Sequence, residues 1–94
     1  MHFPTWVDRE RDRRKRASLR LKYMLSHATL RKYGRTSIHD LARDVGCNHS
    51  SIFNAISRGW FTTEMAHGIE RVLTREELPH EWLVKPLEME VAAS

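Results

Sequence analysis

The segment from Ser37 to Gly59 restricts the possible folds of this chain more than any other part of the sequence. It reads SIHDLARDVGCNHSSIFNAISRG, with apolar residues at helical spacing on both sides of Gly46. Because glycine adopts the left-handed conformation that ends a helix at little steric cost, we expect a helix over 37–45 and a reversal at Gly46. This helix starts at Ser37, where Ser-Ile-His-Asp resembles a capping box with Asp in place of the usual Glu. A second helix over 49–58 follows, with Asn48 as its N-cap. Two short helices joined by a tight turn are typical of a DNA-binding helix-turn-helix.

Charge is distributed unevenly between the two parts of the chain. Residues 1–60 contain 13 Lys and Arg against 5 Asp and Glu, a net charge of +8. Residues 61–94 contain 3 against 7, a net charge of −4, and together the two parts give the +4 of the whole chain. A basic surface favours a polyphosphate partner because binding releases condensed counterions. The alternative is a solvated basic helix, but the basic part is also the part with the helix-turn-helix pattern.

Two further stripes of apolar residues predict one helix before this segment and one after it. The first helix ends near Gly34, and the second begins after Thr62 or Thr63. The stripes consist of Leu21, Met24, Leu25 and Ala28 in the first helix and Met65, Ile69, Val72 and Leu73 in the second. Asp8 is a candidate N-cap for a helix that begins in the charged run DRERDRRKR. The sequence leaves open whether residues 8–16 join the first core helix or form a flexible arm.

The C-terminal part predicts a short fifth helix. Residues 74–77, TREE, are a second capping-box candidate, and Pro79 either begins or interrupts the helix that they open. A last apolar patch comprises Trp82, Leu83 and Leu87. We therefore expect an all-α protein, a compact bundle of about five helices over residues 17–87. A basic N-terminal extension covers residues 1–16 and a tail covers residues 88–94.

The second helix of the helix-turn-helix offers a polar face for reading DNA bases. The side chains assigned to bases are His49, Ser50, Ser51 and Asn54. Asn54 can form a paired donor and acceptor contact with adenine. Arg35, Arg43 and Arg58 flank this face and are assigned to phosphates. Phe53 lies beside the polar row, and we expect it to pack on Trp60 or Phe61 or to stack on a sugar.

Several classes of function are not expected. The histidines have no cysteine partner at metal-ligand spacing, so we predict no metal site and no cofactor. Cys47, the only cysteine, excludes an intramolecular disulfide and is interpreted as a packing residue in a reducing compartment. The acidic residues are interpreted as helix caps or solvated charges, so we expect no enzyme. No apolar run is long enough to cross a membrane, which favours a cytoplasmic protein associated with the bacterial nucleoid.

The segment from about Thr36 to Leu87 resembles the Cro-like and YdaS-like repressors of lambdoid prophages, within the lambda-repressor-like superfamily. The resemblance depends on LARDVGCNHSSIFNAISRG and on the later IER-x-LTREELP. It implies binding to double-stranded operator DNA, as a homodimer or higher homo-oligomer, in the control of prophage genes. By position, it also implies phosphate contacts at Ser57 and Arg58. The first motif position, where the family often has Gln, is Ile38, so Ser37 or His39 takes that backbone contact.

Three features leave alternatives open. The arginine-rich residues 1–16 are unusual for this family and can be a DNA-tracking arm, an oligomerisation element or a solvated helix. A protein partner is the main rival to DNA: an antitoxin would neutralise a toxin, or bind a neighbouring prophage protein, through acidic residues 76–90 with Trp82. RNA binding through the arginine run is a third possibility.

Overall fold

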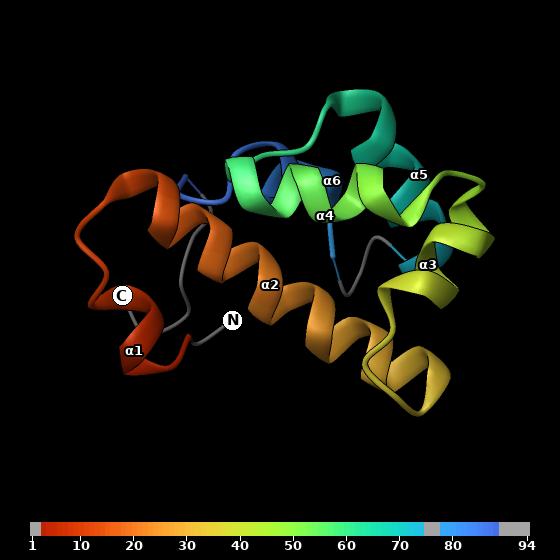
Figure 1. Ribbon diagram of the computed structural model, residues 1–94, viewed down its shortest axis with the longest axis horizontal. Coiled ribbons are helices and arrows are strands. Elements are labelled where there is room, and N and C mark those ends of the chain that lie inside the picture. The colour runs from red at the N-terminus through yellow and green to blue at the C-terminus, as the bar shows by residue number, and fades with distance from the viewer. Residues whose placement is uncertain (1–2, 75–77, 89–94) are drawn as a thin grey trace.

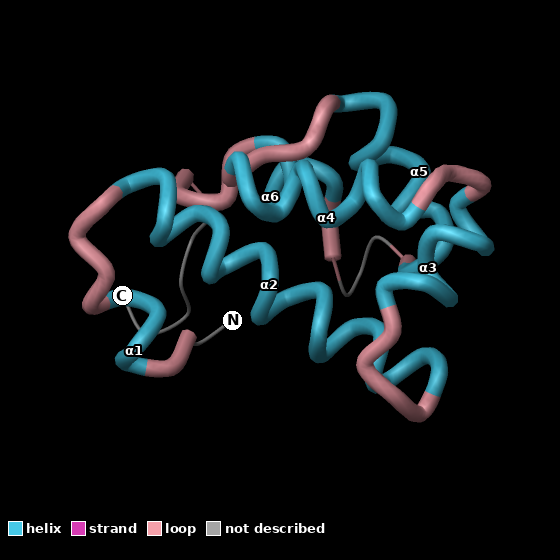
Figure 2. The backbone as a smooth tube through the Cα atoms, in the orientation of Figure 1, coloured by secondary structure: helices cyan, strands magenta, loops and turns pink. Residues whose placement is uncertain are grey.

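The computed structural model describes residues 3–74 and 78–88, and its regular elements there are all α-helices (Figures 1 and 2). These are α1 (Thr5–Asp8), α2 (Arg13–Tyr33), α3 (Ile38–Val45), α4 (His49–Arg58), α5 (Thr63–Leu73) and α6 (His80–Val84). The all-α prediction is confirmed, and the described residues contain six helices where about five were expected because the N-terminal segment forms α1. No described helix has the length and apolar character that a membrane span requires.

The long helix α2 crosses the molecule, and α1, α3, α4 and α5 all pack against it (Figure 1). Asp12 is its N-cap, and the Asp12 carboxylate accepts a hydrogen bond from the Lys15 backbone N–H at 2.9 Å. The prediction that Asp8 caps this helix is therefore wrong. Asp8 ends α1, and a break at residues 9–12 lets a second cap start a new helix. Residues 13–16 consequently belong to α2 rather than to a separate arm.

The core forms where the predicted apolar stripes meet. Its buried members are Leu21, Met24, Leu25, Ala28, Leu41, Ala42, Ile52, Ala55, Ile56, Phe61, Ala66, Ile69, Leu73, Leu78 and Leu83. Burying one Leu, Ile or Phe side chain contributes about 1.5–3 kcal/mol, so this cluster is the main source of stability. The stripe predicted for α2 is fully buried, whereas Met65 and Val72 of the α5 stripe are only partly buried.

The last helix begins at Pro79. The helix α5 ends at Leu73, its C-cap Thr74 has a positive φ of 73°, and Pro79 is the N-cap of α6. Of the two roles expected for Pro79, the structure therefore shows that it begins the helix, and residues 75–77 of the predicted capping box lie outside the described residues. Within α6, Leu83 is buried, and its carbonyl accepts the backbone N–H of Phe61 at 3.0 Å. This bond ties the last helix to the segment that follows α4.

Arg20 of α2 connects both ends of the described chain. Its guanidinium pairs with the Asp8 carboxylate at 3.2 Å and donates to the Pro86 carbonyl at 3.1 Å. The same guanidinium lies 4.9 Å from the centre of the Phe3 ring, which in turn packs edge-on against Tyr23. The N-terminal segment is therefore packed on the body through Phe3.

Candidate nucleic-acid interface

The turn between α3 and α4 has the predicted construction. Gly46 has a φ of 88°, and its N–H donates to the Ala42 carbonyl at 2.8 Å. The Asn48 side chain then caps α4 by accepting the Ser50 backbone N–H at 2.9 Å. Cys47 lies between them, half-buried against the core, and burial raises the pKa of its thiol. The cysteine is thus a protonated packing residue in a turn that fixes α4 relative to α3.

The outer face of α4 carries the four residues predicted to read bases. His49, Ser50 and Asn54 are exposed and Ser51 is half-buried, while Ile52 on the opposite side is fully buried. Among residues 3–74 and 78–88, no hydrogen bond uses the side chain of Ser50 or Asn54. The structure therefore brings the predicted set together on one helix face, with donors and acceptors still available for a ligand.

Phe53 belongs to an aromatic cluster with two histidines, one from each helix of the pair. The His39 and His49 rings stack with centroids 4.1 Å apart, and the Phe53 ring lies 6.2 Å from each, edge-on. Phe53 does not pack on Trp60 or Phe61 as one expectation proposed, because its position on α4 turns it toward α3. It remains 44% exposed. The exposed His39 side chain, which was assigned to the DNA backbone, therefore lies next to His49 and Phe53 on the same surface.

Two of the arginines assigned to phosphate are held by carboxylates. Arg35 contacts Asp40 at 2.8 Å, and Arg43 contacts both Asp40 at 3.1 Å and Asp44 at 3.3 Å. The hydrogen bond from Arg35 holds the pKa of Asp40 below its usual value, and one from the Tyr33 hydroxyl does the same for Asp44. All four groups are charged at neutral pH, so this end of the interface carries little net positive charge.

The other residues assigned to phosphate differ in whether their side chains already make hydrogen bonds within the protein. Ser37 caps α3 by accepting the Asp40 backbone N–H at 3.1 Å, so its hydroxyl oxygen already serves the fold. Arg58 donates to the Trp60 carbonyl at 2.9 Å and covers the Trp60 ring at 4.1 Å. Ser57 is exposed, and its carbonyl accepts a hydrogen bond from Arg14 at 2.9 Å. Of these three side chains, Ser57 is the most available to a phosphate.

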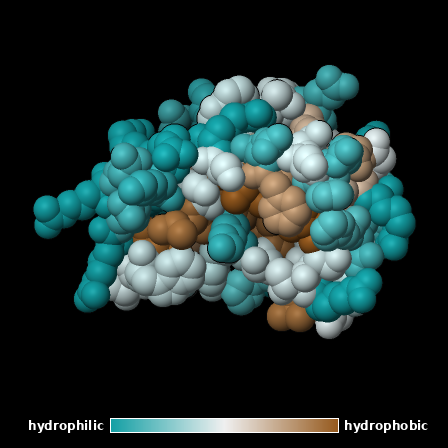
Figure 3. All heavy atoms as spheres, in the orientation of Figure 1, coloured by the Kyte–Doolittle hydropathy of each residue, from teal (hydrophilic) through white to brown (hydrophobic). Residues whose placement is uncertain are grey.

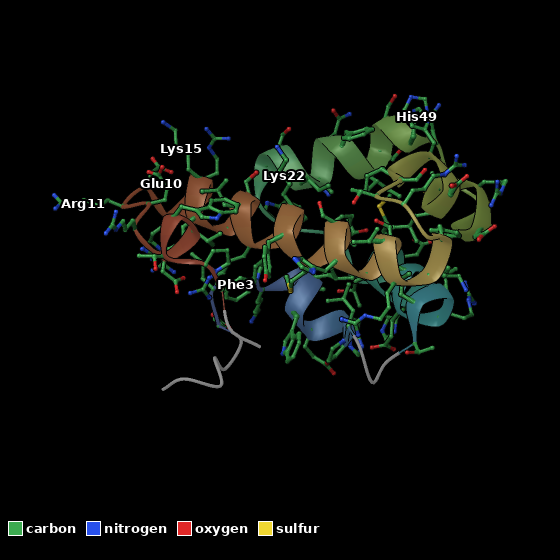
Figure 4. All side chains as sticks on the ribbon, turned by 90° about the horizontal axis from the view of Figure 1, so that it is seen from below. Phe3, Glu10, Arg11, Lys15, Lys22 and His49 are labelled. Atoms are coloured by element: carbon green, nitrogen blue, oxygen red, sulfur yellow. The ribbon has the colours of Figure 1, made fainter. Side chains whose placement is uncertain are left out.

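A groove runs between α2 and the α3–α4 pair. Its main part, of about 460 Å³, is lined by Ser18, Lys22 and Ser26 of α2 and by Phe53 and Ile56 of α4. A second hollow, lined by Arg14 and Lys15, shares two residues with the first, so the groove continues toward the start of α2. Figure 3 shows apolar residues in the middle of this face with hydrophilic residues around them. In Figure 4, Lys15, Lys22 and His49 project from the same side of the molecule.

Lys15 and Lys22 were not expected at the interface. They belong to a stripe of polar residues on α2 that also contains Ser18 and Ser26. The residues stand three or four positions apart, on a face beside the buried stripe, and that spacing was readable in the sequence. The packing of α2 beside α4 could not be predicted from the sequence. This packing makes the polar stripe of α2 one wall of the groove.

The structure also bears on two other predictions, the antitoxin surface and the absence of a metal-ligand set. The proposed antitoxin surface over residues 76–90 is described only at 78–88, and there Trp82 packs partly buried against the core. The prediction of no metal-ligand set considered cysteine as the partner for histidine. The structure instead brings the carboxylate of Glu70 next to His67 and His80 at the junction of α5 and α6. His67 and Glu70 are three residues apart on a helix, a spacing that the sequence analysis overlooked.

Comparison with known proteins identifies no relative. No family model matches this chain, no curated protein is significantly similar to it, and no solved structure is significantly similar to it. The functional interpretation of the α4 surface therefore depends on the geometry and chemistry of its own residues.

Proposed function

We propose that this protein is a sequence-specific DNA-binding regulator whose helix α4 reads the major groove. One observation carries the proposal: α4 buries Ile52 and Ala55 against the core while it presents His49, Ser50 and Asn54 to solvent just after a tight turn from α3. A recognition helix needs this division, because one face must be held rigidly while the other meets base edges.

The exposed side chains of α4 match the chemistry of base edges in the major groove. Asn54 can pair its amide with N6 and N7 of adenine, and His49 can donate to a guanine acceptor. The exposed part of Phe53 can contact the methyl group of thymine, in addition to the sugar considered from the sequence. The stacking of His39 on His49 restricts the His49 ring and so prepares it for one contact geometry.

Backbone contacts in this proposal come from α2. Lys15 and Lys22 lie along the groove beside α4 and project from the same side of the molecule as His49 (Figure 4). Lysines at this position can neutralise phosphates on one side of the major groove and release counterions. Arg35 and Arg43 contribute less, because Asp40 and Asp44 already neutralise them.

The regulatory part of the proposal follows the resemblance to Cro-like and YdaS-like repressors. A single α4 covers only a few base pairs, so high specificity needs two copies on a near-palindromic site about one helical turn apart. We propose a homodimeric or higher homo-oligomeric repressor that acts on operator DNA in a prophage.

The test is selection of bound duplexes from a randomised DNA library, followed by titration of the selected and the scrambled duplex at two salt concentrations. We expect a preference of at least about a thousandfold for the selected duplex, the lower range for specific DNA-binding proteins. The matched control is Asn54→Ala, which should reduce the preference by about 1–3 kcal/mol and retain binding to scrambled DNA.

Equal, salt-sensitive binding to both duplexes would contradict the proposal. Stronger binding to a structured RNA competitor would replace DNA by RNA as the partner.

A further inference from the structure

Three potential metal ligands converge at the junction of α5 and α6. His67 and Glu70 lie on one face of α5, and His80 is the first residue of α6. One ligand atom from each residue lies within 4.8 Å of the other two. Within residues 3–74 and 78–88, this is the only set of three His, Cys, Asp or Glu side chains that meets so closely.

The carboxylate of Glu70 lies near Nδ1 of both imidazoles. One carboxylate oxygen is 2.8 Å from Nδ1 of His80, and the other is 3.9 Å from Nδ1 of His67. Ligand atoms of a tetrahedral ion with bonds of about 2.0–2.1 Å lie about 3.3 Å apart. The two observed separations, which involve different oxygens of Glu70, fall on either side of this value, so a rotation of the exposed His67 side chain is needed to bring one atom of each residue onto one ion.

We propose that His67, Glu70 and His80 bind a divalent transition-metal ion, and that Zn²⁺ is the ion whose chemistry fits best. Two imidazole nitrogens and one carboxylate oxygen suit Zn²⁺, whereas Ca²⁺ and Mg²⁺ take oxygen ligands almost exclusively. Three protein ligands leave one position of the tetrahedron for water or for a ligand from another molecule.

A second carboxylate supports this orientation of His80. Glu81 Oε1 lies 3.4 Å from Nε2 of His80, on the opposite side of the ring from Glu70. When Nδ1 of a histidine binds a metal, Nε2 carries the proton and commonly donates it to a carboxylate, which fixes the tautomer and the ring orientation. His80 therefore has a carboxylate beside each nitrogen, one as a fellow ligand and one as an acceptor.

Exposure of the three side chains fits an ion held at the edge of the fold. Glu70 and His80 are 14% and 21% exposed, so two of the ligands are already held in place. His67 is 54% exposed, and its ring stacks on that of His80 with centroids 3.9 Å apart. On binding, the His67 ring turns away from the stack until its lone pair points to the ion, and solvent gives it room to do so.

The ion would connect two elements that the chain joins only through residues 74–79. It would link α5 to the first residue of α6, and α6 in turn accepts the Phe61 N–H through Leu83. Binding to the folded form alone stabilises that form. The proposed role is therefore structural, and it stands independently of DNA binding.

The experiment uses the full chain without a histidine tag, stripped of metal with a chelator and titrated calorimetrically with ZnCl₂. We expect one ion per chain and a Tm higher by about 5 °C at saturation, the change that roughly 1 kcal/mol gives in a domain of this size. Substitution of Co²⁺ should give the visible absorption bands of a four-coordinate site.

The decisive variant is His67→Ala, because His67 is exposed and its loss should leave the metal-free Tm unchanged. We expect its Zn²⁺ affinity to fall at least tenfold, and Glu81→Gln to reduce affinity by about tenfold through the outer hydrogen bond. His39→Ala is the matched control, since it removes a histidine from the other stacked pair, and it should bind Zn²⁺ like the parent protein.

Three results would overturn the proposal. They are the absence of Zn²⁺ binding at micromolar concentrations, unchanged affinity in His67→Ala, and loss of binding in His39→Ala, which would move the ion to the other histidine pair. Failure of the DNA-binding proposal would leave each of these readouts intact.

Discussion

Helix α3 and the α5–α6 junction each place a nearly buried carboxylate near two basic side chains. Asp40, 11% exposed, holds Arg35 and Arg43, and Glu70, 14% exposed, lies near His67 and His80. Arginine keeps its proton at any physiological pH and cannot bind a metal ion, so the first arrangement is a permanent ion-pair network. Imidazole can exchange a proton for a metal ion, so the arrangement around Glu70 can bind a metal ion although its geometry is similar to that around Asp40.

The two regions also differ in what a substitution should change. The surface of α3 and α4 presents polar side chains outward, where the proposed function uses them for DNA, whereas the side chains at the α5–α6 junction contact one another across two helices. Substitutions on the exposed face of α4 should therefore alter DNA binding and leave the stability unchanged. Substitutions at the α5–α6 junction should alter the stability and leave DNA binding unchanged.

The largest expected effect is at Glu70. Its carboxylate accepts hydrogen bonds from both the backbone N–H and the ring of His80, so Glu70→Ala should lower the free energy of unfolding of the metal-free protein by about 2–3 kcal/mol. Chemical denaturation measures the loss, and Glu64→Ala, an exposed position in the first turn of α5, is the control. A stability equal to that of the control would show that the junction is not a structural clamp.

Asn54 tests the opposite property. Asn54→Ala should reduce the preference for the selected duplex by about 1–3 kcal/mol, because it removes a bidentate contact to one base, and should leave the Tm unchanged. Competition binding and thermal melting measure the two quantities on the same sample. Equal weakening on scrambled DNA would assign Asn54 to the backbone instead.

Lys22 should affect binding to every sequence. Lys22→Ala should lower affinity for all duplexes alike and reduce the salt dependence of binding by about 0.9, the slope that one phosphate contact contributes. Arg58→Ala is the comparison, and its effect should be smaller because Arg58 is already bonded to the Trp60 carbonyl. If Arg58→Ala lowers the affinity for DNA more than Lys22→Ala does, the DNA backbone does not follow the groove beside α4.

Substitution of Asp40 should raise the affinity for DNA. Asp40→Asn removes the negative charge that holds Arg35 and Arg43, so both guanidinium groups gain freedom to contact phosphate. We expect a modest rise in affinity for all duplexes at low salt and little change at high salt, measured by titration at two ionic strengths. A lower affinity would mean that Asp40 positions the arginines for DNA.

The smallest effect concerns acid stability. The Arg35 hydrogen bond lowers the pKa of Asp40 from its ordinary value of 3.8, so the folded protein binds this proton less readily than the unfolded chain. The resulting stabilisation is fully present above that value and is lost as the pH falls through the lowered pKa. Asp40→Asn should therefore flatten the decline of Tm below pH 4. An unchanged decline would assign acid sensitivity to other carboxylates.

Local rules made most of the helices predictable. Ser37, Asn48 and Thr62 cap their helices as expected, and Gly46 reverses the chain with a positive φ, because these effects depend on a few neighbouring residues. The Asp8 cap failed because Asp12 competes for the same helix start at closer range. Of the two alternatives for Pro79, the structure shows that it begins the last helix as its N-cap, and residues 75–77 of the predicted capping box lie outside the described residues.

The sequence by itself determined the helix-turn-helix pattern, the core stripes and the polar row on α4, since each is a matter of helical spacing and capping. Only the tertiary structure decided which distant residues meet: Lys22 beside α4, Phe53 against two histidines, Arg20 between the chain ends, and His80 against Glu70. The physical reason is that helix periodicity fixes which side chains share a face, whereas the packing of the core fixes which faces come together.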